Sequence, residues 1–114
     1  MIKTLGGRRL GRTGEHRRAL LKNLAVSLIL HERLTTTVSK AKELRPFAER
    51  MITQAKLGMY REVRKKLQDK AAYKKLFDVL APRYQNRAGG YTQILRVERR
   101  GGDNAPQGLI RLIT

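Results

Sequence analysis

The first eighteen residues of the chain cannot bury themselves, and this limits what the rest can fold into. They carry five arginines and one lysine against a single acid, Glu15, and four glycines separate the cations. Charged heads are costly to desolvate, and glycine loses the most entropy on ordering. We therefore expect residues 1–12 to form a basic arm that orders against a polyanion, and residues 13–114 to form one globular domain.

The composition of the whole chain fits a small domain with a strongly basic surface. Hydrophobic residues make up 40% of the 114 residues, which is enough for a core. Lys and Arg total 26 against 9 Asp and Glu, for a formal net charge of +17. This charge is typical of proteins that neutralise nucleic-acid phosphates, and an anionic membrane surface is the other polyanion that could attract it.

Several sequence features that would indicate a disulfide-bonded, membrane-spanning or secreted protein are missing. There is no cysteine, which excludes disulfides and thiolate zinc sites and fits a reducing compartment. No apolar run of about 18 residues could span a membrane, and the N-terminus lacks the apolar region of a secretory signal. We interpret the chain as cytoplasmic, or as already mature, and an organellar source stays open.

The sequence of the first half of the domain predicts a helix, a strand and a second helix. Apolar residues at helical spacing predict a helix from an N-cap at Thr13 to near His31. β-branched residues predict a strand over 34–38. Helical spacing resumes at Ala41 and ends near Gly58, and we expect Pro46, on the outer face, to kink or break that helix.

The second half changes from helical to extended patterns. A short helix is predicted around 60–67, and a second one is capped by Asp69 and stops at Pro82. Strands are predicted over 91–98 and 109–113, joined as a hairpin. The order α-β-α(α)α-β-β indicates an α+β fold, a two-layer domain with helices packed on one side of a small sheet.

The sequence offers little for catalysis, and we predict no enzyme, cofactor or metal site. His16 and His31, the only histidines, fall on one predicted helix and roughly 22 Å apart, too far to share a substrate or a metal ion. The acids stand mostly alone among bases, as Glu62 does with Lys66 one helical turn away. The glycines between Gly6 and Gly11 match no phosphate-loop pattern.

The few aromatic residues, with no Trp, argue against a protein that binds single-stranded nucleic acid by stacking bases on aromatic side chains. Phe47 and Phe77 are expected in the core. Tyr84 and Tyr91 flank a glycine turn and allow two interpretations: they stack on a splayed base, or they pin the turn against the domain. Basic residues between Arg61 and Lys75 are interpreted as a solvated helix face.

Three stretches closely resemble the family of bacterial large-subunit ribosomal protein L-seventeen (L17). They are residues 7–24, GRRLGRTGEHRRALLKNL, residues 31–45, HERLTTTVSKAKELR, and the segments 76–84, 87–92 and 99–106. The likeness runs from end to end in the right order. The chain departs from the family at Ile2-Lys3, where Arg-His is usual, and at Gln93, where a basic residue is common.

The resemblance implies a two-layer α/β fold and a structural role in the large ribosomal subunit, near the peptide exit region. It implies large-subunit, 23S-type rRNA as the partner, with the small ribosomal protein L-thirty-two (L32) as a neighbour. A free DNA-binding architectural protein and a small nuclease are the alternatives. The predicted rRNA-binding residues are Lys3, Arg8, Arg9, Arg12, His16, Arg17, Arg18, Lys22, Lys40, Lys42, Arg45, Arg83, Arg87, Arg96, Arg99 and Arg100.

Overall fold

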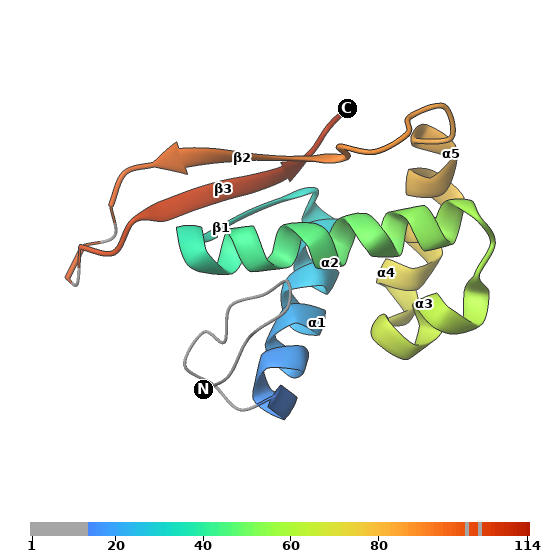
Figure 1. The fold of residues 1–114 in the computed structure, drawn as a ribbon, viewed down its shortest axis with the longest axis horizontal. Helices are drawn as coiled ribbons and strands as arrows, with labels where there is room; N and C mark the ends of the chain where they lie inside the picture. The colour runs from blue at the N-terminus through green and yellow to red at the C-terminus, as the bar shows by residue number, and fades with distance from the viewer. Residues whose placement is uncertain (1–13, 100, 103) are drawn as a thin grey trace, which may run out of the picture.

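A computed structural model describes residues 14–99, 101–102 and 104–114. Helices and strands follow the predicted order (Figure 1). The predicted N-cap Thr13 and the arm lie outside the described residues. The elements are α1 (Gly14–His31), β1 (Arg33–Thr37), α2 (Val38–Lys56), α3 (Tyr60–Lys66), α4 (Lys70–Lys75), the π-helix η1 (Leu76–Leu80), α5 (Ala81–Arg83), β2 (Thr92–Val97) and β3 (Gln107–Leu112).

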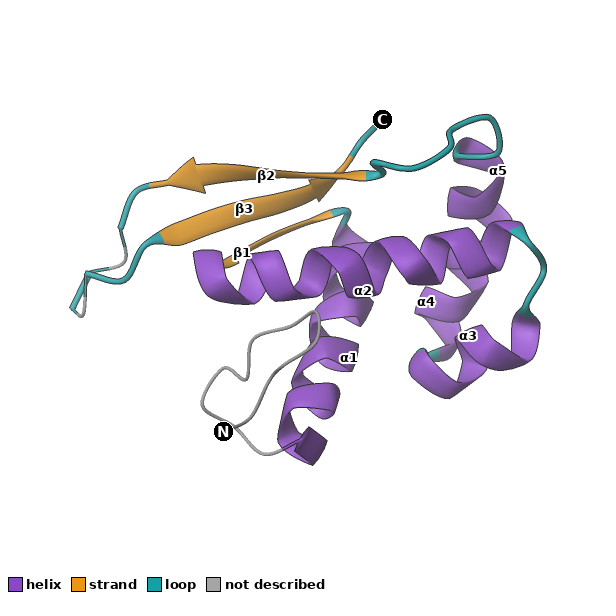
Figure 2. Ribbon diagram, viewed as in Figure 1, coloured by secondary structure: helices purple, strands orange, loops and turns teal. Residues whose placement is uncertain are grey.

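The three strands form one antiparallel sheet in the order β1-β3-β2. Strands β2 and β3 are the predicted hairpin, and the described residues of the loop at its end are drawn in teal in Figure 2. Strand β1, from the first half of the domain, pairs with the other side of β3 and sets Leu34 opposite Ile110. The described helices lie on one side of this sheet (Figure 1), so the predicted two-layer α+β architecture is confirmed.

The core lies between the sheet and helices α1 and α2. Every third or fourth residue of each helix is buried, as the apolar spacing predicts. Phe47 and Phe77 are partly buried and pack against this core. Its main members are Leu21, Ala25 and Leu28 of α1, Ala41, Leu44, Ala48, Met51 and Ile52 of α2, Leu76 and Leu80 of η1, and Ile110 and Leu112 of β3.

Helix α2 differs from its prediction at its start and at Pro46. It begins at Val38, because the side chain of Thr37 accepts a hydrogen bond from the Lys40 amide at 3.3 Å and caps the helix, so β1 ends one residue earlier than expected. The helix continues through Pro46, so of the two alternatives expected there, a kink or a break, the break is wrong. Pro46 is exposed on the outer face, as expected, where the backbone group that it leaves unpaired can meet water.

The helix that Asp69 begins was predicted to stop at Pro82, and this is also wrong, because α5 extends to Arg83. In η1 the Ala81 amide bonds to the Leu76 carbonyl, five residues back, instead of the usual four. The shifted pattern puts Pro82 in the first turn of α5, where a residue without an N–H is tolerated.

The cap of α4 gives a first testable prediction. The Asp69 carboxylate accepts a hydrogen bond from the Ala72 amide at 2.9 Å. Asp69→Ala should lower the free energy of unfolding by about 1 kcal/mol in urea titrations, because an amide at the helix start loses its acceptor. Asp69→Asn should keep most of this stability. Equal losses for both variants would contradict a capping role.

Candidate nucleic-acid interface

Helix α1 presents cations on its N-terminal half. His16 and Arg18 are exposed, and Lys22 lies one turn beyond Arg18. Arg18 and Lys22 line a groove of about 690 Å³ between α1 and the connection from α3 to α4, where Lys66 also lies. Asn23, Ser27 and Gln68 add uncharged polar groups, and Glu15 and Asp69 are the acids of the lining.

Lys66 is a residue of this groove that was not among the predicted rRNA-binding residues. The predicted pairing with Glu62 is wrong, because Glu62 pairs with Lys65 at 3.5 Å while Lys66 Nζ donates to Gln54 Oε1 at 3.2 Å. Burial lowers the pKa of Lys66, and the positive charge of Arg50 lowers it further. An anion in the groove would stabilise this ammonium. Its position depends on how α3 packs on α2, which sequence spacing does not reveal.

Helix α2 brings a second group of cations to the same part of the fold. Arg17 of α1 forms an ion pair with the buried Glu43 of α2, so the N-terminal halves of the two helices are joined. Lys40 and Lys42 lie just before Glu43, and the first turn of α2 contains no acid. Because the positive end of a helix dipole disfavours cations, this arrangement favours an anion nearby. We call Arg18, Lys22, Lys40 and Lys42 the helix cations.

Among the described residues, the predicted site residues Arg17, Arg45 and Arg83 have acidic partners. Arg17 pairs with Glu43, and Arg45 Nε lies 3.5 Å from Glu49 Oε2. Arg83 donates from both terminal nitrogens to the Glu32 carboxylate, at 2.7 and 3.2 Å. Arg17 and Arg83 join separate segments of the fold, while Arg45 pairs within α2. The charge of all three is therefore less available to an external ligand than that of the helix cations.

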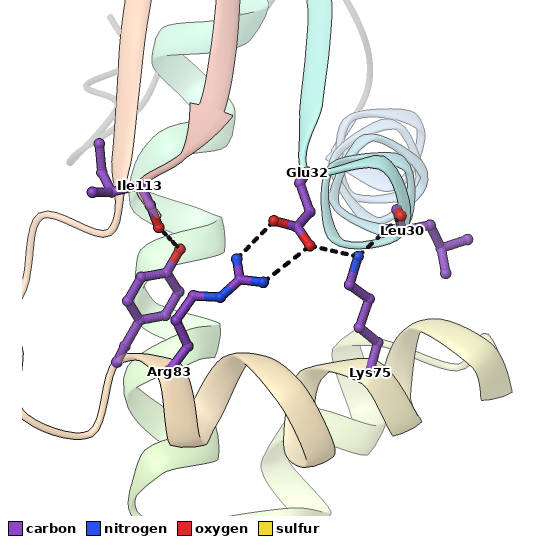
Figure 3. A network of polar contacts seen from close by, with 6 residues as sticks. Leu30, Glu32, Lys75, Arg83 and Ile113 are labelled. Carbon is purple, nitrogen blue, oxygen red and sulfur yellow. Dashed lines mark hydrogen bonds and ion pairs between the residues drawn. The ribbon is translucent and has the colours of Figure 1, made fainter.

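The Arg83 contact belongs to a network at the junction of α1 and β1, drawn in Figure 3. Lys75 Nζ lies 2.9 Å from the Glu32 carboxylate and donates to the Leu30 carbonyl at 3.1 Å. Lys75 was predicted on a solvated face, and this is wrong. Hydrogen bonds from Arg83 and Lys75 lower the pKa of Glu32 from 4.5 to about 2, and the bond to Glu32 raises the pKa of Arg83.

The two tyrosines beside the glycine turn are buried, at 2% exposure for Tyr84 and 1% for Tyr91. The Tyr84 hydroxyl donates to the Ile113 carbonyl, and the Tyr91 hydroxyl lies 2.9 Å from Lys56 Nζ. Rings buried to this extent offer no face to a nucleobase. The structure therefore supports the interpretation that they pin the turn against the domain.

The remaining predicted residues lie around the hairpin and the turn before it, or outside the described residues. Arg96 and Arg99 are exposed, and Arg99 Nη1 donates to the Asn104 carbonyl at 3.0 Å. Arg87 is exposed, and its Nε donates to the Gly90 carbonyl at 3.2 Å. Lys3, Arg8, Arg9, Arg12 and Arg100 lie outside the described residues.

Neither a cluster of metal-ligating side chains nor a membrane-spanning helix occurs among the described residues. Within them, no three His, Asp or Glu side chains are placed to hold a metal ion. None of the described helices is long and apolar enough to cross a membrane.

A two-layer α+β domain whose neighbouring helices and hairpin carry cations without an acidic partner among the described residues is typical of basic proteins associated with nucleic acids. Comparison with known proteins narrows this class. The family model described as "Ribosomal protein L17" matches residues 20–113, and the chain belongs to that family. This match confirms the resemblance found in the sequence. The family is one of structural ribosomal proteins and not an enzyme family.

Relatives match over almost the whole chain. The chain is 54% identical to "Large ribosomal subunit protein bL17" of Elusimicrobium minutum, over 99% of both sequences. It is 50% identical to the protein of the same name from Endomicrobium trichonymphae, over 100% of both. The protein of that name from Syntrophotalea carbinolica is 49% identical over 94% of this chain and 71% of its own length.

Proposed function

We propose that this chain is a structural component of the large ribosomal subunit that binds large-subunit rRNA by neutralising backbone phosphates. Membership of the L17 family and the names of the relatives support the assignment to the large subunit. The helix cations carry the binding mechanism, because two of them line one groove and two stand near the start of α2, whose first turn contains no acid. Phosphate contacts position a protein on RNA without reading its sequence, so specificity comes from RNA shape.

The finer parts of the proposal rest on the resemblance and on the sequence. The arm, residues 1–12, extends the contact and orders on binding, as its arginines and glycines predict. The hairpin cations Arg96, Arg99 and Arg100 add backbone contacts. The site in the subunit is near the peptide exit region, beside ribosomal protein L32, and the protein acts in the cytoplasm on the ribosome.

Binding should depend steeply on salt. If about six phosphates are neutralised, the logarithm of the rRNA association constant should fall with the logarithm of salt concentration with a slope of about −4 to −5. Filter binding of the full chain to large-subunit rRNA between 50 and 300 mM salt measures this slope. A slope near zero would contradict phosphate neutralisation.

Competition in the same assay separates the alternatives. Unlabelled large-subunit rRNA should displace the bound RNA at a far lower concentration than duplex DNA, because the proposed recognition depends on RNA shape. Equal competition by DNA would favour a general architectural protein. Cleavage of the RNA that is lost when His16 and His31 are both replaced would favour a nuclease.

A further inference from the structure

The sheet has one covered face and one open face. On the covered face, Gly108, Ile110 and Leu112 of β3 are buried toward the helices. Alternate residues point to the opposite face, where no helix of the described chain lies (Figure 1). That open face carries Arg33, Thr35, Thr37, Gln93, Leu95, Val97, Gln107, Leu109 and Arg111, among which there is no acid.

The strand register sets two arginines of the open face directly opposite each other. Arg33 of β1 pairs with Arg111 of β3, and Gln93 of β2 is the next residue across the sheet. Directly opposed residues have Cβ atoms about 4.5–5.5 Å apart, and like charges there destabilise the sheet. Both arginines are exposed. The register therefore places two cations together at a cost to the unbound protein.

No acid of the described residues pairs with either arginine. Arg111 donates from Nε and Nη2 to the Gln93 amide oxygen, at 2.9 and 2.8 Å, and this acceptor is uncharged. Arg33 and Arg111 line a hollow of about 450 Å³ together with His31 and Thr114. Glu32 also borders it, but its carboxylate is already held by Arg83 and Lys75.

We propose that Arg33 and Arg111 form a phosphate-binding pair, which makes the open face of the sheet a second RNA contact separate from the helix cations. This inference rests on the proposed function. A phosphodiester group has two unesterified oxygens, and guanidinium groups bind such oxygens in a paired geometry. One phosphate between the two arginines would replace their repulsion by two attractions. Gln93 holds Arg111 in place for this contact.

The test uses the full chain with Arg33→Gln and Arg111→Gln combined. In filter binding to large-subunit rRNA, the salt slope should become shallower by about 1 unit, and affinity at 0.1 M salt should fall about tenfold. The thermal midpoint without RNA should stay equal or rise, because the like-charge repulsion is gone. The matched control, Arg61→Gln with Lys65→Gln, removes two exposed cations from α3 and should leave the slope unchanged.

The outcomes distinguish the pair from the proposed function as a whole. A steep slope for the wild type with an unchanged slope for the double variant would overturn the pair and leave the proposed function intact. Equal effects of the double variant and its control would mean that overall charge governs rRNA binding, and this would overturn the arginine pair as a specific phosphate site. Normal rRNA binding with failed incorporation into large subunits would point to an acidic protein partner instead. A flat wild-type slope would overturn both proposals.

Discussion

Glu32→Gln is expected to lower the free energy of unfolding at pH 7 by about 2 kcal/mol, because the change removes a carboxylate that two cations share. Arg83 and Lys75 would then lose their acidic partner at sites that are only 26% and 23% exposed. Glutamine keeps the size of the side chain, so the loss reports the charge. Chemical unfolding followed by circular dichroism measures it.

The same variant gives a pH test. The pKa of Glu32 is lowered from 4.5 to about 2 in the folded protein, so its contribution to stability is present above pH 4.5 and is lost as pH falls toward 2. The difference in stability between the wild type and Glu32→Gln should therefore shrink between pH 5 and pH 2.

A matched control separates this network from ordinary surface ion pairs. Glu62→Gln breaks a contact with Lys65, whose side chain is 73% exposed, and should change stability by less than about 0.5 kcal/mol. Equal effects at Glu32 and Glu62, or a Glu32 effect that does not vary with pH, would contradict the role of the network.

Replacing all four helix cations by glutamine should weaken rRNA binding by about 10³-fold at 0.1 M salt, if each contacts one phosphate. The reason is the loss of counterion release at four positions. The thermal midpoint should change little, because none of the four is in an ion pair of the described chain. Filter binding and thermal unfolding of the same preparation give both results.

The matched control removes four exposed cations from α3 and α4, by Arg61→Gln, Lys65→Gln, Lys70→Gln and Lys74→Gln. Its net charge equals that of the helix-cation variant. Binding should stay within about tenfold of the wild type, since these residues are proposed to face solvent. If the two variants lose affinity equally, overall charge governs binding and the helix cations form no interface.

The order of helices and strands could be predicted from the sequence because apolar spacing is a local signal. Leu21, Leu28 and Leu44 recur at helical intervals and are buried as expected. Local signals were less reliable at the prolines. At Pro46, the solvent-facing position permits the helix to continue. At Pro82, the preceding π-helical turn permits helical backbone to continue to Arg83.

Features that depend on packing between distant segments could not be predicted. Glu32 adopts a φ of 64°, a left-handed conformation in which a side chain costs about 1–2 kcal/mol. Its ion pairs come from residues more than 40 positions away, and no spacing rule indicates them. The pairing of Arg33 with Arg111 depends in the same way on the register of β1 against β3.

The candidate site was predicted in part. Cations on α1 and at the start of α2 were each named from the sequence, and the Arg17–Glu43 pair joins the two helices that carry them. Their binding to rRNA stays a prediction. The internal partners of Arg17 and Arg83 were missed, because attraction to an acid and attraction to a phosphate look alike in a sequence. Burial of Tyr84 and Tyr91 resolved an ambiguity that their sequence neighbours left open.

Sedimentation of the tagged chain from cell lysate on a sucrose gradient tests the central claim most directly. We expect the protein to migrate with the large ribosomal subunit and to shift to the top of the gradient when RNase digests the rRNA. Migration with free protein before digestion would contradict a place in the large subunit.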